Sequence, residues 1–457
     1  MKHLPWLVSV ALAAGFLALY LSDLSTVPFH PDESTWIYMS QDFATLVVQH
    51  DPGALAWALG QPQSLEVQYR LLNAPLPKYL IGLSGWLSGY SAADLNADWV
   101  WAQMWNENVA AGHLPRPGLL LAGRLPGTVL SALSTALIFW IGYEAGGLGV
   151  GVMAALLLGF NPLVLLHGRR AMAEGVALFF SLLAVWGTLR LVKRQAADSI
   201  RRHLRGLLPS LGVGFLLGLA ASSKQSAAAL LPAALLAVAL PILRLSDFAS
   251  LKLRLQRLAL TWFALVLGCG LTFWALNPIL YRQPLAVAKA MLEARAELAQ
   301  RQTNDNRALF PESVTPDVVS RLRAAVLEVY LRPPAVWDLP VYLDQLAPQA
   351  EAYFAQPLIR LERMPLLGAL LAGLGLAGAA FSVLRLWRER LSAATLGEQT
   401  VWWWTLSMSG LILLTTPFEW QRYFMPLVPL ASLFATWGLA ALARPAALFI
   451  RTRVSWP

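Results

Sequence analysis

Long apolar runs, repeated along most of the chain, constrain its fold more than any other feature. We identify ten of them, at about residues 5–22, 119–143, 150–166, 174–192, 207–222, 226–243, 258–280, 364–386, 401–416 and 424–443. Each is close to the roughly 20 residues that an α-helix needs to cross the hydrocarbon core of a bilayer. Only 13% of the residues are charged, about half the fraction in soluble globular proteins. The sequence therefore predicts an all-α polytopic membrane protein with about ten transmembrane helices.

The charges between these runs predict the orientation. The links after the fourth, sixth and eighth runs and the C-terminal tail are basic, and with ten spans all four lie on one side. The positive-inside rule makes that side cytoplasmic, with both termini inside, as in a prokaryotic plasma membrane. We interpret residues 5–22 as an uncleaved anchor rather than a cleaved signal peptide. The basic residues cluster in the short links between apolar runs, so the net charge of +9 does not indicate a nucleic-acid partner.

Two long polar segments fall on the opposite, extracytoplasmic side. The first loop, 23–118, has nine acidic and three basic residues, and the second, 281–362, has ten acidic and nine basic ones. Residues 74–90 are apolar, but a span there would place every later basic link outside. We therefore expect 74–90 to lie at the outer surface, with further surface helices at 33–50 and 54–59 and a helix at 284–303. The whole chain, 1–457, is predicted to form one membrane domain.

Two adjacent carboxylates, Asp32 and Glu33, follow His30 and Pro31 just after the first span. Proline suits the first position of a helix, and acidic residues are favoured in its first turn. An ordinary helix start would explain the triplet equally well. Its place beside a membrane surface, in a chain with few acidic groups, makes it the centre of our functional hypothesis.

Ionisable residues also gather at the predicted outer ends of the spans, where they mark functional sites by default. The alternative for each one alone is that it snorkels to the interface. As a set they form a basic cluster that faces Asp32 and Glu33. Arginine and lysine can bind a lipid phosphate, while a carboxylate takes a proton from an acceptor or holds a metal ion. The set comprises Lys78, Arg124, His167, Arg169, Arg170, Glu174, Lys224, Glu419, Arg422 and Tyr423.

Four short motifs resemble the GT-C superfamily of membrane glycosyltransferases, in particular the protein O-mannosyltransferases and the lipid A aminoarabinose transferase. Residues 30–33 (His-Pro-Asp-Glu) resemble the acidic motif of the family's first extracytoplasmic loop. Residues 73–78 (Asn-Ala-Pro-Leu-Pro-Lys) are similar to the His-Pro-Pro-Leu-Gly-Lys motif of the mannosyltransferases, with Asn and Pro replacing its His and Gly. Residues 169–174 (Arg-Arg-Ala-Met-Ala-Glu) resemble a second acidic motif, and 421–429 resemble a C-terminal Arg-Tyr-x-x-Pro motif.

The resemblance implies a GT-C-like bundle with juxtamembrane helices in its first loop, and transfer of a sugar from a polyprenyl-phosphate donor with inversion. It implies Asp32 as the general base, with Glu33 supporting it or binding metal. Lys78, Arg170, Lys224 and Arg422 would bind the donor phosphate. Glu174 and His30 would shape the acceptor or metal site. A divalent cation, Mg²⁺ or Mn²⁺, is left open at Asp32, Glu33 and Glu174, and the acceptor (protein, lipid or polysaccharide) is not specified.

Two other functions fit the same apolar pattern. One is a transporter or flippase for a lipid-linked or anionic substrate, although such proteins place their charged site near the bilayer midplane. The other is a non-catalytic lipid-binding subunit. Consumption of a polyprenyl-phosphate sugar separates the enzyme from both.

Overall fold

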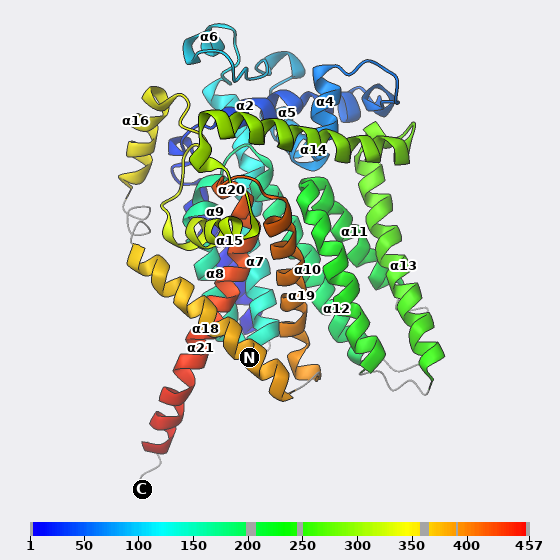
Figure 1. Cartoon of the computed structure of the whole chain (residues 1–457), viewed down its shortest axis with the longest axis vertical. Helices are drawn as coiled ribbons and strands as arrows, with labels where there is room; N and C mark the ends of the chain where they lie inside the picture. The colour runs from blue at the N-terminus through cyan, green and yellow to red at the C-terminus, as the bar shows by residue number, and fades with distance from the viewer. Residues whose placement is uncertain (1–2, 198–206, 245–249, 357–364, 390–391, 454–457) are drawn as a thin grey trace.

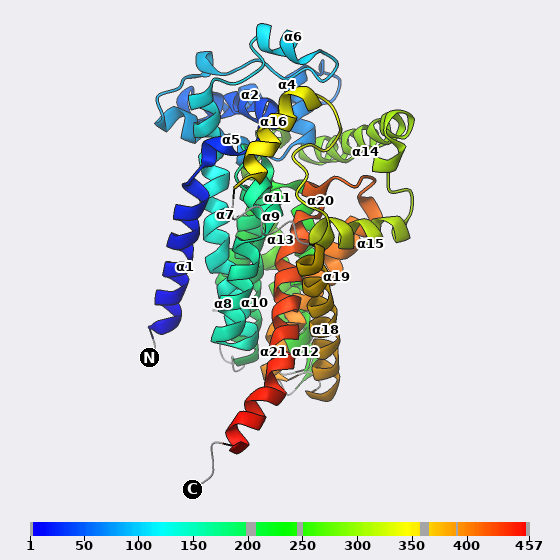
Figure 2. The ribbon, with the colours of Figure 1, turned by 90° about the vertical axis from the view of Figure 1, so that its left-hand side faces the viewer.

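The computed structural model describes residues 3–197, 207–244, 250–356, 365–389 and 392–453. In these residues the secondary structure is helical, apart from one isolated β-bridge between Val314 and Phe418. Figures 1 and 2 show long helices side by side in a bundle and shorter helices lying across one end of it as a cap. The prediction of an all-α polytopic membrane protein is confirmed.

Each of the ten predicted spans overlaps a helix of the bundle. These helices are α1 (Leu4–Leu21), α7 (Pro117–Gly146), α8 (Leu148–Gly159), α10 (Ala173–Ala197), α11 (Leu207–Ser223), α12 (Leu230–Arg244), α13 (Leu251–Leu276), α18 (Pro365–Glu389), α19 (Leu396–Thr415) and α21 (Val428–Arg453). Among the described residues, seven helical segments are long and apolar enough to cross a membrane, and α8 and α11 are apolar but shorter. A total of ten spans stays a prediction.

The third predicted span, 150–166, is not one continuous helix. Helix α8 ends at Gly159, and the short α9 (Pro162–His167) follows at an angle. The side chain of Asn161 accepts the N–H of Leu163 at 3.0 Å, and Pro162 occupies the first position of α9. An Asn cap followed by Pro favours a new helix start. This break brings residues 167–172 beneath the cap.

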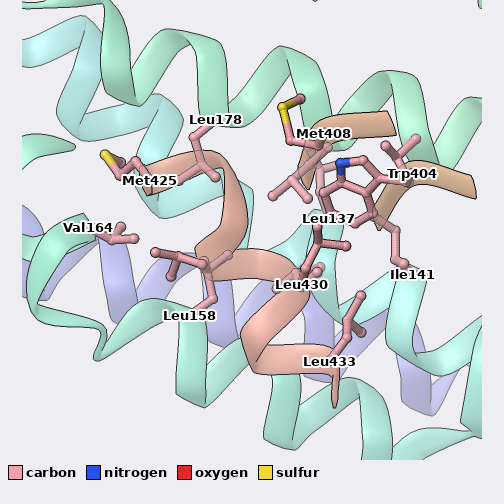
Figure 3. Packing of buried hydrophobic residues seen from close by; sticks show 14 of the residues in the cluster. Leu137, Ile141, Leu158, Val164, Leu178, Trp404, Met408, Met425, Leu430 and Leu433 are labelled. Atoms are coloured by element: carbon pink, nitrogen blue, oxygen red, sulfur yellow. The ribbon is translucent and has the colours of Figure 1, made fainter. Parts of the chain in front are cut away.

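The bundle packs around one apolar core. Figure 3 shows its centre, where side chains from α7, α8, α9, α10, α19 and α21 meet, among them Leu137, Leu178, Trp404 and Leu433. Glycines allow close approach elsewhere: a Cβ at Gly214 of α11 would meet the carbonyl oxygen of Leu265 in α13 at 2.5 Å. Small residues at helix contacts are typical of membrane bundles.

The cap is built from both long loops. From the first loop come α2 (Pro31–Met39), α3 (Gln41–Phe43), α4 (Leu65–Leu72), α5 (Pro75–Leu87) and α6 (Trp105–Ala110), and from the second come α14 (Pro284–Leu309), α15 (Val318–Val326) and α16 (Leu343–Phe354). Helix α5 lies in the cap and has 13 residues, about 20 Å at 1.5 Å per residue, so it is too short to span. The predicted surface position of 74–90 therefore agrees with the structure.

Two other predictions about the loops have different outcomes. The helix expected at 284–303 is present and extends to Leu309. The surface helix expected at 54–59 is wrong: a 3₁₀ turn covers Pro52–Leu55, and Ala56 is extended. Asp51 caps this turn by accepting the N–H of Ala54. The first helix of the loop begins at Pro31 rather than residue 33.

Candidate active site

The start of α2 is held by a capping box. His30 is the N-cap residue and its Nδ1 accepts the N–H of Asp32 at 3.1 Å, while Glu33 Oε2 accepts the N–H of His30 at 3.0 Å. Pro31 occupies the first helical position. The sequence-based expectation of a helix start at Pro31 is therefore met, and the turn aims Asp32 and Glu33 in different directions.

Glu33 is fully buried and forms an ion pair with Arg124 of α7. Both carboxylate oxygens accept from the guanidinium at 2.8 Å, and Oε1 also accepts the N–H of Ala171 at 2.8 Å. Burial would raise the pKa of Glu33, but Arg124, Arg170 and these hydrogen bonds outweigh it and lower the pKa. The carboxylate thus joins the cap to α7 and to the turn before α10.

Asp32 stands at the centre of a second, more accessible cluster. Its side chain is 23% exposed, and its Oδ2 accepts from Nη1 of Arg422 at 2.5 Å. The Nε of Arg422 lies 2.8 Å from Oδ2 of Asp338, and Nε2 of His30 lies 3.3 Å from the same oxygen. Arg422 comes from α20 (Gln421–Phe424), just before the last span. The cluster therefore joins both loops to the end of the bundle.

Asp338 is a functional candidate that the sequence reasoning missed. It is one of ten acidic residues in the second loop, and no motif distinguishes it from the others. Its burial and its contact with Arg422 appear only in the fold. Burial would raise the pKa of Asp338, but Arg422 and His30 outweigh it and hold the pKa well below its usual range.

Glu174 and Lys224 form a third ion pair, at the cap end of α10. Nζ of Lys224 donates to Oε1 of Glu174 at 3.0 Å. It also lies 5.6 Å from the ring centre of Tyr423, while the guanidinium carbon of Arg422 lies 5.7 Å from the same ring. Both cations therefore lie near the same aromatic ring, and their role in binding a phosphate stays a prediction.

A pocket lies beside this pair. Glu174 and Lys224 lie at its polar end, and its other walls are mainly apolar, including Leu178, Leu182 and Trp404. From Glu174 to Leu182 the pocket follows α10 for eight residues, about 12 Å along the helix. It is therefore an apolar space between helices with one carboxylate and one ammonium at its mouth.

The other two predicted phosphate ligands lie elsewhere. Lys78 is buried in the cap, where its Nζ donates to Asp42 at 2.5 Å, and Arg70 donates to the same carboxylate. Burial lowers the pKa of Lys78, an effect that Asp42 partly offsets. Arg170 is also fully buried, and its guanidinium donates to the carbonyl oxygens of Pro28 and Val336 at 3.2 and 2.6 Å. These two cations connect parts of the cap.

One group of side chains could hold a divalent cation. His30, Asp32 and Asp338 each offer a ligand atom, and these atoms lie within 4.8 Å of one another. Oδ2 of Asp338 is buried, with Nε of Arg422 and Nε2 of His30 as its charged and polar neighbours. Nitrogen and carboxylate ligands of this kind suit several divalent metals. The donor set therefore fits a metal ion, although Arg422 already supplies a positive charge between the two carboxylates.

Comparisons with known proteins relate this geometry to a family. Residues 60–276 match the family of dolichyl-phosphate-mannose-protein mannosyltransferases, a little under half of the chain. This range includes Lys78, Arg170, Glu174 and Lys224. No match was found among curated proteins.

Solved structures of an oligosaccharyltransferase from Archaeoglobus fulgidus share the fold. The structure with zinc and sulfate has a TM-score of 0.53 and 16% identity, and the alignment covers 98% of this chain and 52% of the other. The structure tethered to an acceptor peptide has a TM-score of 0.51 and 13% identity, with coverage of 98% and 51%. The chain thus spans about half the length of these proteins. The comparisons thus show similarity to the mannosyltransferase family over residues 60–276 and a fold shared with the archaeal oligosaccharyltransferase.

Proposed function

We propose that this protein transfers a sugar from a polyprenyl-phosphate donor to an acceptor at the extracytoplasmic face of the membrane, with inversion at the anomeric carbon. One observation carries the proposal: Asp32 meets Arg422 beside an apolar pocket whose mouth holds Lys224. A base, a pair of cations and a space for a lipid chain lie together, as glycosyl transfer from a lipid phosphate requires.

The pocket supports a lipid-linked donor. Its length along α10, about 12 Å, is close to the depth of one leaflet of a hydrocarbon core about 30 Å thick. A polyprenyl chain would lie among Leu178, Leu182 and Trp404 and place its phosphate near Lys224. Arg422, whose guanidinium also lies near the ring of Tyr423, would contact the same phosphate. Lys224 and Arg422 are therefore our proposed phosphate ligands, while Lys78 and Arg170 stabilise the cap.

The proposed reaction is a single displacement. Asp32 takes the proton from the acceptor hydroxyl or amine as the acceptor atom bonds to the anomeric carbon. The bond between that carbon and the phosphate oxygen breaks, and the phosphate leaves on the polyprenyl lipid. Lys224 and Arg422 stabilise the negative charge that develops on it. Glu33, whose carboxylate is occupied by Arg124, fixes the turn that presents Asp32.

A divalent cation, Mg²⁺ or Mn²⁺, would be held by His30, Asp32 and Asp338, whose ligand atoms lie within 4.8 Å of one another, rather than by Glu33 or Glu174, which lie outside this group. It would supply further positive charge against the donor phosphate. The related oligosaccharyltransferase, which was crystallised with zinc, supports a metal in this fold.

We further propose that the protein lies in the plasma membrane of a prokaryote, with its cap outside and both termini in the cytoplasm. In Figures 1 and 2 the start of α1 and the end of α21 lie at the end of the bundle opposite the cap. Basic residues at that end, such as Lys193, Arg244 and Arg385, agree with the positive-inside rule. The two loops then build one extracytoplasmic site, as expected if the chain works as one membrane domain.

The charged cluster also favours an enzyme over a transporter. Transporters place their binding groups near the bilayer midplane, whereas Asp32, Arg422, Asp338 and Lys224 lie together at the cap end of the bundle. The family match, to transferases that act on protein, and the acceptor peptide of the archaeal structure leave a protein acceptor as one alternative.

The test is donor consumption by the full-length protein in liposomes. A radiolabelled polyprenyl-phosphate sugar is added with a membrane extract as the source of acceptor. We expect labelled product from the wild type and a loss of about 10²- to 10⁴-fold in Asp32→Asn. Asp305→Asn is the matched control, because Asp305 is exposed on α14. Donor left intact by the wild type, or equal rates for wild type and Asp32→Asn, would contradict the proposal.

A further inference from the structure

The first loop carries an exposed tryptophan that the bilayer does not explain. Among the described residues, the exposed tryptophans are Trp6, Trp86, Trp101, Trp262, Trp274 and Trp387. All except Trp101 belong to apolar helices, where tryptophan is common at a membrane interface. Trp101 instead lies in the non-helical segment leading into α6, and α6 is in the part of the cap farthest from the spans (Figures 1 and 2).

Trp101 belongs to a group of four aromatic residues, Trp99, Trp101, Trp105 and Tyr342, which we name the aromatic platform. Trp99 is 2% exposed and forms its base, packing on Trp105 and Tyr342 with ring centres 5.3 and 5.6 Å apart. Trp101 is 45% exposed and lies 6.2 Å from the ring of Tyr342. The platform therefore presents a supported indole to solvent.

The second loop fixes this platform in place. Tyr342 adopts a left-handed backbone conformation with φ of 60°, and its hydroxyl donates to the carbonyl oxygens of Gln103 and Trp101 at 2.8 and 3.3 Å. A non-glycine residue at positive φ is uncommon and usually has a local reason. Here the reason is a contact between the two loops. Tyr342 follows Asp338 by four residues, so the same segment shapes both the platform and the charged cluster.

The platform adjoins the candidate active site through His30. The rings of Trp101 and His30 have centres 6.3 Å apart, and Nδ1 of His30 lies 4.0 Å from Oδ2 of Asp32. Trp101 is therefore separated from the proposed base by one side chain. It lies on the aqueous side of Asp32, whereas the apolar pocket extends into the bundle from Glu174 and Lys224.

We propose that the aromatic platform binds a saccharide unit of the acceptor, by stacking of a sugar ring on Trp101. A pyranose ring presents C–H bonds on its face and hydroxyl groups at its edge. The C–H bonds match the negative face of an indole, and the hydroxyl groups at the edge stay in contact with water. The acceptor is then a glycan or glycolipid. This inference rests on the proposed function, because it names the acceptor class of the same site.

The test measures binding without turnover. Full-length protein in lipid nanodiscs is applied to an array of immobilised oligosaccharides built from hexoses and amino sugars, and to a matched peptide array. We expect the wild type to bind a subset of the saccharides. Trp101→Ala should weaken this binding about tenfold, and Trp101→Phe, which keeps an aromatic face, should weaken it less. Trp86→Ala is the matched control, because Trp86 is exposed but lies on α5.

The outcomes separate this inference from the proposed function. Asp32→Asn should bind saccharides as the wild type does, because Trp101 contacts His30 rather than the base, so binding and donor consumption can fail independently. The inference is overturned if no arrayed saccharide binds with a Kd below about 1 mM, if Trp101→Ala and Trp101→Phe bind unchanged, or if Trp101→Ala instead removes binding to peptides. Unchanged thermal unfolding of the variants shows that a loss of binding is local.

Discussion

The substitution Glu33→Gln separates the two adjacent carboxylates of α2 by their roles. Glu33 is 0% exposed and accepts two hydrogen bonds from Arg124, one from the N–H of His30 and one from the N–H of Ala171. Glutamine removes the charge and turns an NH₂ group toward one set of donors. Breaking a buried ion pair while leaving its partner charged costs about 3–5 kcal/mol. We therefore expect Glu33→Gln to destabilise the protein by about that amount.

The assay is thermal unfolding of the purified protein in detergent. Unfolding is monitored through the reactivity of the one thiol, Cys269, which is buried in α13. Asp32→Asn should unfold close to the wild type, because Asp32 is 23% exposed. Glu297→Gln is the matched control. Glu297 is exposed on α14, and a surface change of this kind stays within about 0.5 kcal/mol.

A second substitution tests the assigned cause. In the Glu33→Gln background, Arg124→Met removes the uncompensated charge, so the double variant should lose less stability than the sum of the two single changes. The guanidinium also donates to the carbonyl oxygens of Leu24 and Val27, so rescue is partial. If Glu33→Gln unfolds like the wild type but is inactive, Glu33 takes part in the chemistry and our structural assignment is refuted.

Four further predictions follow from the charged groups and the pocket. Asp338→Asn should lower kcat by about 10²-fold, measured by donor consumption, and should also lower the thermal stability, because it leaves Arg422 and His30 without a buried anionic partner. Lys224→Ala should raise the KM for the donor about tenfold, whereas Lys289→Ala, on the exposed face of α14, should leave it unchanged. Ser181→Phe should fill part of the pocket and exclude a labelled polyprenyl phosphate without unfolding the protein. Because the pKa of Glu33 is lowered in the folded state, the ionised carboxylate stabilises the fold at neutral pH. This stabilisation should be lost as the pH falls from about 4.5 through the folded pKa. Melting temperatures measured against pH should therefore show this loss in the wild type and not in Glu33→Gln.

The bundle could be predicted from the sequence because its signal is local. An apolar run of about 20 residues indicates a span without knowledge of its neighbours. The helix break at Asn161 and Pro162 could also have been predicted from the sequence, since Asn followed by Pro is a helix-start signal. The helix predicted at 54–59 is wrong although Ala and Leu favour helix formation: contacts between distant residues decide its conformation, since the N–H of Trp57 donates to the carbonyl oxygen of Ile279 and that of Leu59 to Gln283.

The candidate site was predictable only in part, because ion pairs depend on contacts between distant residues. The sequence indicated that cations gather near Asp32, but not which one contacts it. Lys78 pairs with Asp42 over 36 positions, and Arg170 binds carbonyl groups of both loops. Asp338 had no signal of its own, since it becomes distinctive only through Arg422, 84 positions further along the chain. Motif resemblance cannot supply such pairings.

The Asp32–Arg422 contact joins residues 390 positions apart in the chain. Arg422 is therefore translated near the end of synthesis. The carboxylate of Asp32 can pair with it only after the last helix has inserted into the membrane. A nascent chain that has inserted every earlier segment still lacks the arginine that pairs with Asp32. We therefore expect a chain truncated ahead of Arg422 to lack activity even where its earlier helices insert.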